Sequence, residues 1–166
     1  MEDSGLKDEL GHFLNNYGVS KSTSQKKFGS SSAYFDGTSD YVEVTDDRSF
    51  KFNDNDFTIE MWVQMPLATA ADSYHTLACK WATGAADNLK SWWFGVYDQF
   101  GGPTSSGYGK VYWTNSDTLG GNTSSPSISL PTSVWHHVAM VGHSLTFTTF
   151  MDGNAGTSHT YSPELM

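Results

Sequence analysis

Residues 57–64, FTIEMWVQ, decide the fold because apolar and polar side chains alternate along them. Phe57, Ile59, Met61 and Val63 take every second position, with Thr, Glu, Trp and Gln between them. Successive side chains of an extended chain point to opposite faces, so this alternation is typical of a half-buried β-strand. The stretch therefore predicts a strand whose Phe57 face lies in the core.

A second stretch, residues 135–141 (WHHVAMV), carries apolar side chains on both faces, as a strand in the middle of a sheet does. We predict that Trp135, Ala139 and Val141 join the Phe57 face in the core. The adjacent residues His136 and His137 point to opposite faces of a strand, so the pair cannot chelate one metal ion.

Further β-type runs flank these two stretches, and clusters of Gly, Asp, Asn and Ser separate them. The predicted strands are Ser32–Phe35, Tyr41–Val44, Phe57–Gln64, His75–Trp81, Trp92–Tyr97, Lys110–Thr114, Trp135–Val141, Leu145–Met151 and Thr157–Tyr161. Asp36-Gly37 and Asp152-Gly153 predict two hairpin turns, because Gly tolerates positive φ. Without helices between the strands, the predicted fold is all-β, an antiparallel two-sheet jelly-roll sandwich.

The composition suits one domain with a sizeable core, because 37% of the 166 residues are hydrophobic and 14% are aromatic. The net charge of −9 argues against nucleic acid as a partner. No apolar run is long enough to span a membrane, and the first twenty residues lack an apolar signal core. We therefore expect no membrane insertion and no export signal. Cys79 follows Leu77 and Ala78 and is predicted to be a buried thiol.

The N-terminal segment, residues 1–26, differs from the predicted sandwich domain at residues 27–166. Apolar residues recur at helical spacing within Ser4–Asn15, which predicts a short amphipathic helix. Residues 20–32 are rich in Ser and Lys and predict a loop.

Several short motifs, in this order, resemble the concanavalin A-like, laminin G-like jelly rolls. The motifs are Lys27-Phe28-Gly29, AYFDG at 33–37, Asp40-Tyr41-Val42, DFTIEMWV at 56–63, WHHVA at 135–139 and Met151-Asp152-Gly153. Domains that look like this occur in extracellular proteins, in surface adhesins and, often with a similar Ser/Thr/Gly-rich composition, in structural proteins of tailed bacteriophages.

The resemblance implies a binding or assembly role. We expect a structural or attachment module of a bacteriophage virion, such as a tail-fibre, tail-tip or capsid-decoration component, assembled in the host cytoplasm. Its expected partners are other virion proteins, copies of itself or host-surface glycans. The alternative is a carbohydrate-binding module of a secreted or cell-surface protein.

Glycosidases also occur on this fold, but the acidic residues are poorly placed for their chemistry. Retaining hydrolysis needs two carboxylates about 5 Å apart, which a strand supplies only when acids share one face, as in E-x-D-x-E. Glu43 and Glu60 each stand alone on their strands, and the sequence has no G-x-S-x-G motif. The sequence therefore predicts a protein that is not an enzyme.

Aromatic residues are the candidate ligand contacts, because an exposed Trp or Tyr ring stacks on the apolar face of a sugar or anchors a protein interface. These residues are Trp92, Trp93, Tyr97, Tyr108, Tyr112 and Trp113. The neighbours Trp92 and Trp93 must point to opposite faces of a strand. Packing in the core is the competing interpretation for each ring.

Calcium is the cofactor that the resemblance implies, because laminin G-like domains often bind it at a loop edge through an Asp carboxylate and backbone carbonyls. The candidate ligands, all at strand ends, are Asp36, Asp40, Asp98 and Asp152. An Asp before Gly also forms turns, so a purely structural role stays open for them.

The chain continues for thirteen residues after Gly153, fewer than similar domains use for their closing strand. An uncovered sheet edge exposes backbone donors and acceptors that pair with another chain. Either Leu6–Asn15 or another subunit would cover that edge, and we predict an oligomer or a larger assembly.

Overall fold

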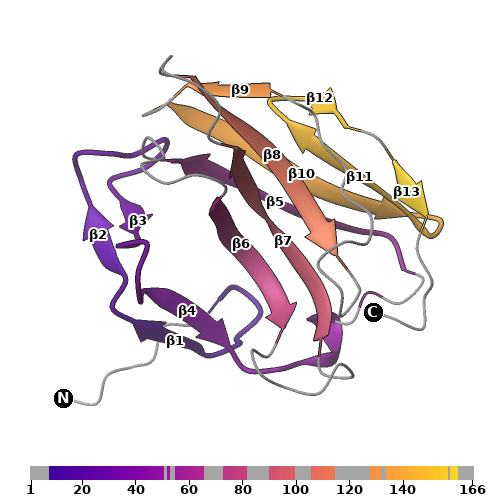
Figure 1. The fold of residues 1–166 in the computed structure, drawn as a ribbon. Helices are drawn as coiled ribbons and strands as arrows, with labels where there is room; N and C mark the ends of the chain where they lie inside the picture. The colour runs from indigo at the N-terminus through magenta and orange to yellow at the C-terminus, as the bar shows by residue number, and fades with distance from the viewer. Residues whose placement is uncertain are drawn as a thin grey trace. The chain divides into compact units, whose positions relative to one another are not determined.

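The computed structural model in Figure 1 divides the chain into two compact units, unit 1 (residues 1–50) and unit 2 (residues 51–166). The structure describes residues 8–50, 52, 55–65, 73–81, 90–99, 106–114, 128–131, 134–156 and 158–160. Within these residues the chain forms strands and no α-helix, so the all-β prediction is confirmed. No helix of this described part is long and apolar enough to cross a membrane.

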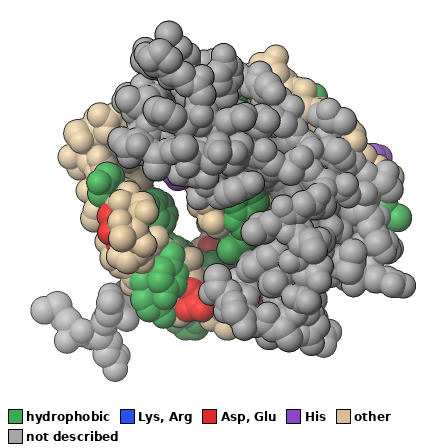
Figure 2. All heavy atoms as spheres, viewed as in Figure 1, with side chains coloured by type: hydrophobic (Ala, Val, Ile, Leu, Met, Phe, Trp, Pro, Cys, Tyr) green, Lys and Arg blue, Asp and Glu red, His purple; other side chains and the backbone are tan. Residues whose placement is uncertain are grey.

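Unit 1 consists of two short antiparallel strand pairs. β1 (Leu14–Tyr17) pairs with β4 (Tyr41–Val44), and β2 (Ser20–Ser22) pairs with β3 (Ser32–Tyr34). A 3-10 turn, η1 (Arg48–Phe50), follows β4. Tyr17 and Tyr41 lie opposite each other, and their rings stack with centroids 4.3 Å apart, a cross-strand contact that stabilises this pairing. Figure 2 shows hydrophobic groups of unit 1 at the surface over β1 and β4, where Tyr17 and Tyr41 are exposed.

The helix predicted within Ser4–Asn15 is wrong over its described part, because Asp8 closes a tight turn there. Asp8 Oδ1 accepts the N–H groups of Leu10 at 3.0 Å and His12 at 2.8 Å. Gly11 adopts a φ of +92°, which a right-handed helix does not contain. Side-chain hydrogen bonds to the local backbone therefore prevail over a weak helical periodicity.

The prediction of a hairpin at Asp36-Gly37 is also wrong, because the strands on either side, β3 and β4, pair with different strands and not with each other. Asp36 instead organises a loop. Its Oδ1 accepts the N–H groups of Thr38 at 2.7 Å, Ser39 at 2.9 Å and Asp40 at 3.2 Å. The Asp side chain thus forms the turn hydrogen bonds that the sequence pattern assigned to paired strands.

Unit 2 consists of a five-stranded and a four-stranded antiparallel sheet. The five-stranded sheet has the order β12 (Asn154–Ala155), β11 (Thr146–Met151), β10 (Trp135–His143), β5 (Phe57–Gln64), with β13 (His159–Thr160) also on β11. The four-stranded sheet has the order β6 (Ser73–Trp81), β7 (Lys90–Gln99), β8 (Ser106–Thr114), β9 (Ile128–Pro131). Each predicted strand is present, while β1, β2, β9 and β12 were not predicted.

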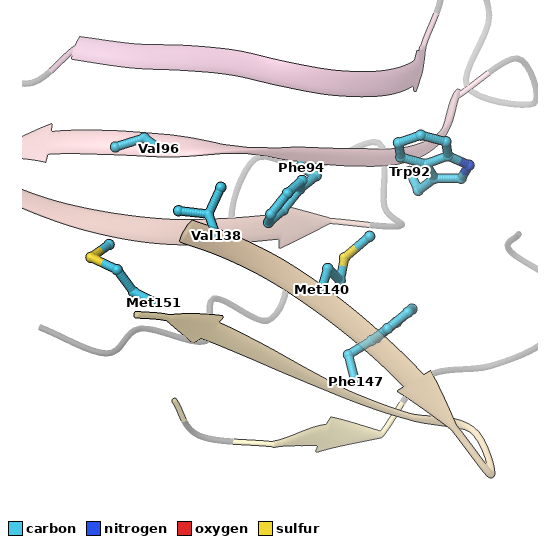
Figure 3. Close-up of a cluster of buried hydrophobic side chains, with 7 residues drawn as sticks. All are labelled: Trp92, Phe94, Val96, Val138, Met140, Phe147 and Met151. Carbon is cyan, nitrogen blue, oxygen red and sulfur yellow. The ribbon is translucent and has the colours of Figure 1, made fainter. Parts of the chain in front are cut away.

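The core of unit 2 lies between these two sheets, as the close-up in Figure 3 shows. One layer supplies side chains from β7, and the facing layer supplies them from β10 and β11. The buried residues are Trp92, Phe94, Val96, Val138, Met140, Phe147 and Met151. Phe57, Ile59, Met61 and Val63 of β5 pack against this cluster, so the predicted inner face of that strand is confirmed.

The predicted inner face of β10 is wrong. Val138 and Met140 are fully buried, whereas Trp135, Ala139 and Val141 belong to the opposite face of the strand. Of these three, Trp135 and Val141 are half-buried, and only Ala139 is buried, as predicted. The register explains this outcome, because Val138 pairs with Met61 and Met140 pairs with Ile59. Residues directly opposite each other share a sheet face, so the even-numbered residues of β10 join the inner face of β5.

Cys79 is exposed, so the prediction of a buried thiol is wrong. The register of β6 against β7 shifts between Thr76 and Ala78, and Leu77 and Ala78 both pack against the core. A bulge adds one residue and interrupts strict alternation. Cys79 therefore falls on the outer face, directly opposite Trp93.

Candidate functional site

Trp93 lies on the outer face of the four-stranded sheet. Its neighbours Trp92 and Phe94 point into the core, so alternation along β7 directs Trp93 outward. The Trp93 indole N–H donates a hydrogen bond of 2.9 Å to Thr76 Oγ1 on the adjacent strand β6. This cross-strand bond holds the ring in one orientation on the sheet.

Gly95 provides the space that the Trp93 ring occupies. A Cβ atom added to Gly95 would lie 2.3 Å from Trp93 Cζ2, 2.4 Å from Trp93 Cη2 and 2.5 Å from the backbone oxygen of His75. Such distances are far shorter than van der Waals contact, so a larger residue would displace the ring. A strand glycine often marks a position where another group approaches the backbone closely. Here that group is the indole of Trp93.

Trp92 is unavailable to a ligand, which corrects its predicted role. Its side chain is 6% exposed, and its ring packs against Phe52 with centroids 5.2 Å apart. Core packing, the competing interpretation, therefore applies to Trp92. Trp113 pairs in register with Phe94, whose side chain is buried.

The other aromatic candidates are placed by their backbones alone. Tyr112 pairs with Gly95, Tyr97 with Lys110 and Tyr108 with Gln99. The side chains of Tyr97, Tyr108, Tyr112 and Trp113 lie outside the described parts of the structure. Their roles as ligand contacts therefore stay predictions.

A second group of side chains, Glu60, Trp62 and His137, gathers on the outer face of the five-stranded sheet. His137 lies directly opposite Trp62, and the two ring centroids are 5.3 Å apart at an angle of 52°. His137 Nε2 lies 3.3 Å from Glu60 Oε2. Alternation already placed Glu60 and Trp62 on one face of β5. The cross-strand register that adds His137 is not visible in the sequence, so this cluster was not predicted.

Comparison with known proteins gives one family. The Laminin_G_3 model, described as the concanavalin A-like lectin/glucanases superfamily, matches residues 36–165. The chain belongs to this superfamily. Neither the curated proteins nor the solved structures gave a match. The matched range crosses the boundary between the two units at Phe50.

Membership in the concanavalin A-like superfamily supports a carbohydrate-binding type of module. Domains of this kind are mostly non-catalytic binding modules, although glucanases belong to the same superfamily. The match carries no specific sign of an enzyme.

The acidic residues that the laminin G-like resemblance marks for calcium already have protein partners where they are described. Asp36 accepts backbone N–H groups, first from Ser39 and then from Thr38, and these bonds lower the pKa of its carboxyl. An Oδ atom of Asp40 accepts the Asp36 N–H at 2.9 Å. Asp98 pairs in register with Ser73 and Gly109, but its side chain lies outside the described residues. In the described part of the chain, no three His, Cys, Asp or Glu side chains gather into a group that could hold a metal ion, so calcium binding through a single carboxylate and backbone carbonyls stays a prediction.

Asp152 binds His136 at the beginning of β10. His136 Nδ1 lies 2.6 Å from Asp152 Oδ2, and the His137 N–H donates to Asp152 Oδ1 at 2.9 Å. The Asp152 N–H returns a bond of 2.8 Å to the His137 oxygen. Asp152 and Gly153 have φ values of +48° and +80° and connect β11 to β12, so the second predicted hairpin is confirmed.

A second His–Asp pair lies at the other end of β10. His143 Nδ1 is 2.7 Å from Asp56 Oδ2, and the Ser144 N–H donates to Asp56 Oδ1 at 3.3 Å. The His136 side chain is 8% exposed, whereas the His143 side chain is 74% exposed. Within the described residues, His136 Nε2 is buried without a hydrogen-bond partner.

The carboxyl pKa values of Asp152 and Asp56 are lowered by the same kind of hydrogen bond, although burial, which opposes it, is the largest single effect only at Asp152. Burial raises the pKa of Asp152, but the hydrogen bonds from the His136 ring and the His137 N–H outweigh it and leave that pKa below its usual value. The bond from the His143 ring, followed by that from the Ser144 N–H, lowers the pKa of Asp56. Hydrogen bonds to the ionised form favour that form in both cases.

Proposed function

We propose that this chain is a non-enzymatic carbohydrate-binding module whose ligand stacks on the Trp93 indole. The observation that carries the proposal is the fixed orientation of this ring, bound to Thr76 and seated against Gly95. A ring that is already immobile loses little conformational entropy when a sugar stacks on it. Because its N–H bonds to Thr76, the indole contributes an apolar face to the ligand.

The engagement of the described carboxylates supports a binding role over catalysis. Asp56, Glu60 and Asp152 each lie within hydrogen-bond or ion-pair distance of a histidine. A retaining glycosidase needs two carboxylates about 5 Å apart, one as acid and one as nucleophile. No such pair appears on the strands of the described part of the chain. We therefore assign no catalytic residue.

We also propose a setting for this module, namely a structural or attachment component of a bacteriophage virion. The Ser/Thr/Gly-rich composition supports this setting, because it resembles structural proteins of tailed phages. The alternative is a secreted or cell-surface protein. Capsid and tail genes next to this reading frame would support the virion, and genes for secreted carbohydrate-active proteins would support the alternative.

Replacement of Trp93 tests the binding function. Glycan-array screening of the intact chain should identify a ligand, and titration calorimetry should then show that Trp93→Ala weakens its binding by about ten-fold or more. Gly95→Ala should weaken binding as well, because the added Cβ displaces the ring. Tyr34→Ala is a control, since it removes an exposed aromatic ring of unit 1.

Two results would overturn the proposal. One is wild-type affinity in Trp93→Ala with the fold intact by circular dichroism. The other is the absence of binding to every glycan tested.

A further inference from the structure

We propose that Glu60, Trp62 and His137 form a docking site for a basic segment of a protein partner. In this site an arginine guanidinium lies over the Trp62 ring and pairs with the Glu60 carboxylate. The site lies on the outer face of β5 and β10, and it is independent of the glycan site proposed at Trp93 on the other sheet.

The spacing of Glu60 and Trp62 suits a cation held between them. They are two residues apart on one strand and share its outer face, so their Cα atoms are about 7 Å apart. A guanidinium within about 6 Å of an indole centroid is attracted by the ring, and from there it reaches a carboxylate two positions along. Glu60 is 62% exposed and Trp62 is 37% exposed, so both present surface to a partner.

His137 positions the other two side chains. Its ring contacts Trp62 across the strand pair, and its Nε2 lies 3.3 Å from one Glu60 oxygen, Oε2. This contact directs the Glu60 carboxylate toward the Trp62–His137 ring pair. Among the described residues, His137 is the ionisable group that pairs with Glu60, through Oε2, and the other carboxylate oxygen can accept an N–H of an arginine.

The neighbours of this cluster favour a cation over a sugar. A sugar ring presents many hydroxyls that need donors and acceptors around it. Here Glu60 lies opposite Ala139, and Ala139 lies opposite Phe150 on the next strand, so neither the Ala139 nor the Phe150 side chain offers a hydrogen-bond donor or acceptor to a sugar. A carboxylate and an aromatic ring each attract a guanidinium, by charge-assisted hydrogen bonding and by the cation–π interaction. The chain's net charge of −9 also attracts a basic partner.

A short arginine peptide tests the site on the full chain. The probe is acetyl-Gly-Arg-Gly-amide, and its control is the same peptide with citrulline, which keeps the shape of arginine without its charge. Binding is followed in the 15N-labelled protein through the indole N–H resonance of Trp62, identified by its absence in Trp62→Ala. We expect a saturable shift with the arginine peptide and none with the citrulline peptide.

Two charge-matched variants sharpen this test. Glu60→Gln should weaken arginine-peptide binding by about five-fold or more. Glu9→Gln removes the same charge from an exposed position in unit 1, and it should leave the affinity within about two-fold of wild type. Trp93→Ala should also leave the affinity for the arginine peptide unchanged. The test of the arginine site is therefore independent of the test of the glycan site at Trp93.

Three outcomes would overturn this inference. They are an equal shift with the citrulline peptide, equal affinities for the Glu60→Gln and Glu9→Gln proteins, and a Trp62 shift produced by a neutral oligosaccharide in place of the arginine peptide. The last outcome would make the cluster a second sugar site.

Discussion

The two ends of β10 carry the same His–Asp chemistry in different surroundings. The Nδ1 to Oδ2 distances are 2.6 Å for His136–Asp152 and 2.7 Å for His143–Asp56, and each Asp also accepts the N–H of the residue after its histidine. Only His136 is buried. In water an exposed pair exchanges one set of hydrogen bonds for another, whereas a buried donor that loses its acceptor has no substitute. Burial, and not distance, should decide what each pair contributes.

Truncation of the two carboxylates should give the largest difference between the two ends. Asp152→Ala leaves the buried His136 Nδ1 and the His137 N–H without their acceptor, and we expect a loss of about 2–3 kcal/mol in the free energy of unfolding. Asp56→Ala should leave the urea midpoint at its wild-type value. Similar midpoints for the two variants would contradict the comparison.

Gly142→Ala should show that, at the His143 end of β10, stability depends on the packing of the Phe57 ring. A Cβ added to Gly142 would lie 2.2 Å from Phe57 Cε1, and that ring is already stacked on Phe52 at 3.9 Å. We expect Gly142→Ala to lower the free energy of unfolding by about 1–3 kcal/mol, the usual cost of overpacking. Wild-type stability of Gly142→Ala would show that the Phe57 ring moves away without cost.

Acid should reduce the contribution of the buried pair. The pKa of Asp152 is lower in the folded chain than its ordinary value of 3.8, so the folded state binds fewer protons than the unfolded state near that pH. The resulting stabilisation is complete above 3.8 and is lost as pH falls through the lower, folded pKa. The difference in unfolding free energy between wild type and Asp152→Asn should therefore narrow below about pH 4. A difference that stays constant from neutral to strongly acidic pH would refute the assignment.

Salt should have the smallest effect, and only at the exposed end. Sodium chloride at about 0.5 M screens charges beyond a few ångströms in water. Any difference in melting temperature between wild type and Asp56→Asn at low salt should therefore disappear. The difference in melting temperature between wild type and Asp152→Asn should persist, because the His136 side chain of that pair is shielded from solvent. Thermal melts at two salt concentrations measure both differences.

The sequence predicted the fold well where its patterns had one interpretation. Strict alternation gave β5 its bounds and its inner face. On β10 both faces are apolar, so alternation could not choose between Trp135 and Val138 as core residues, and the register with β5 decided it. Cys79 was misassigned because a bulge in β6 adds a residue that no periodicity reveals. Asp8 and Asp36 bind the local backbone, an interaction that residue patterns describe only as a turn preference.

The candidate sites were predictable to a smaller extent. Alternation required Trp92 and Trp93 to point in opposite directions, but only the packed sheets show that Trp92 points inward. The role of Gly95 follows from the place of the Trp93 ring, which depends on a hydrogen bond across two strands. His137 joins Glu60 and Trp62 through pairing between residues that are more than seventy positions apart. Side-chain groups that form across such distances have no signature in one sequence.

The two-layer packing of unit 2 also determines how many ligands it can hold at one time. The sheets face each other through the core, so Trp93 and Trp62 look outward in opposite directions. Stacked sheets are about 10 Å apart. Two ligands on the outer faces would therefore be separated by the full thickness of the two-sheet sandwich, with no steric conflict between them. Each copy would then be a bivalent connector, and an array of copies would gain avidity on both sides from contacts that are individually weak.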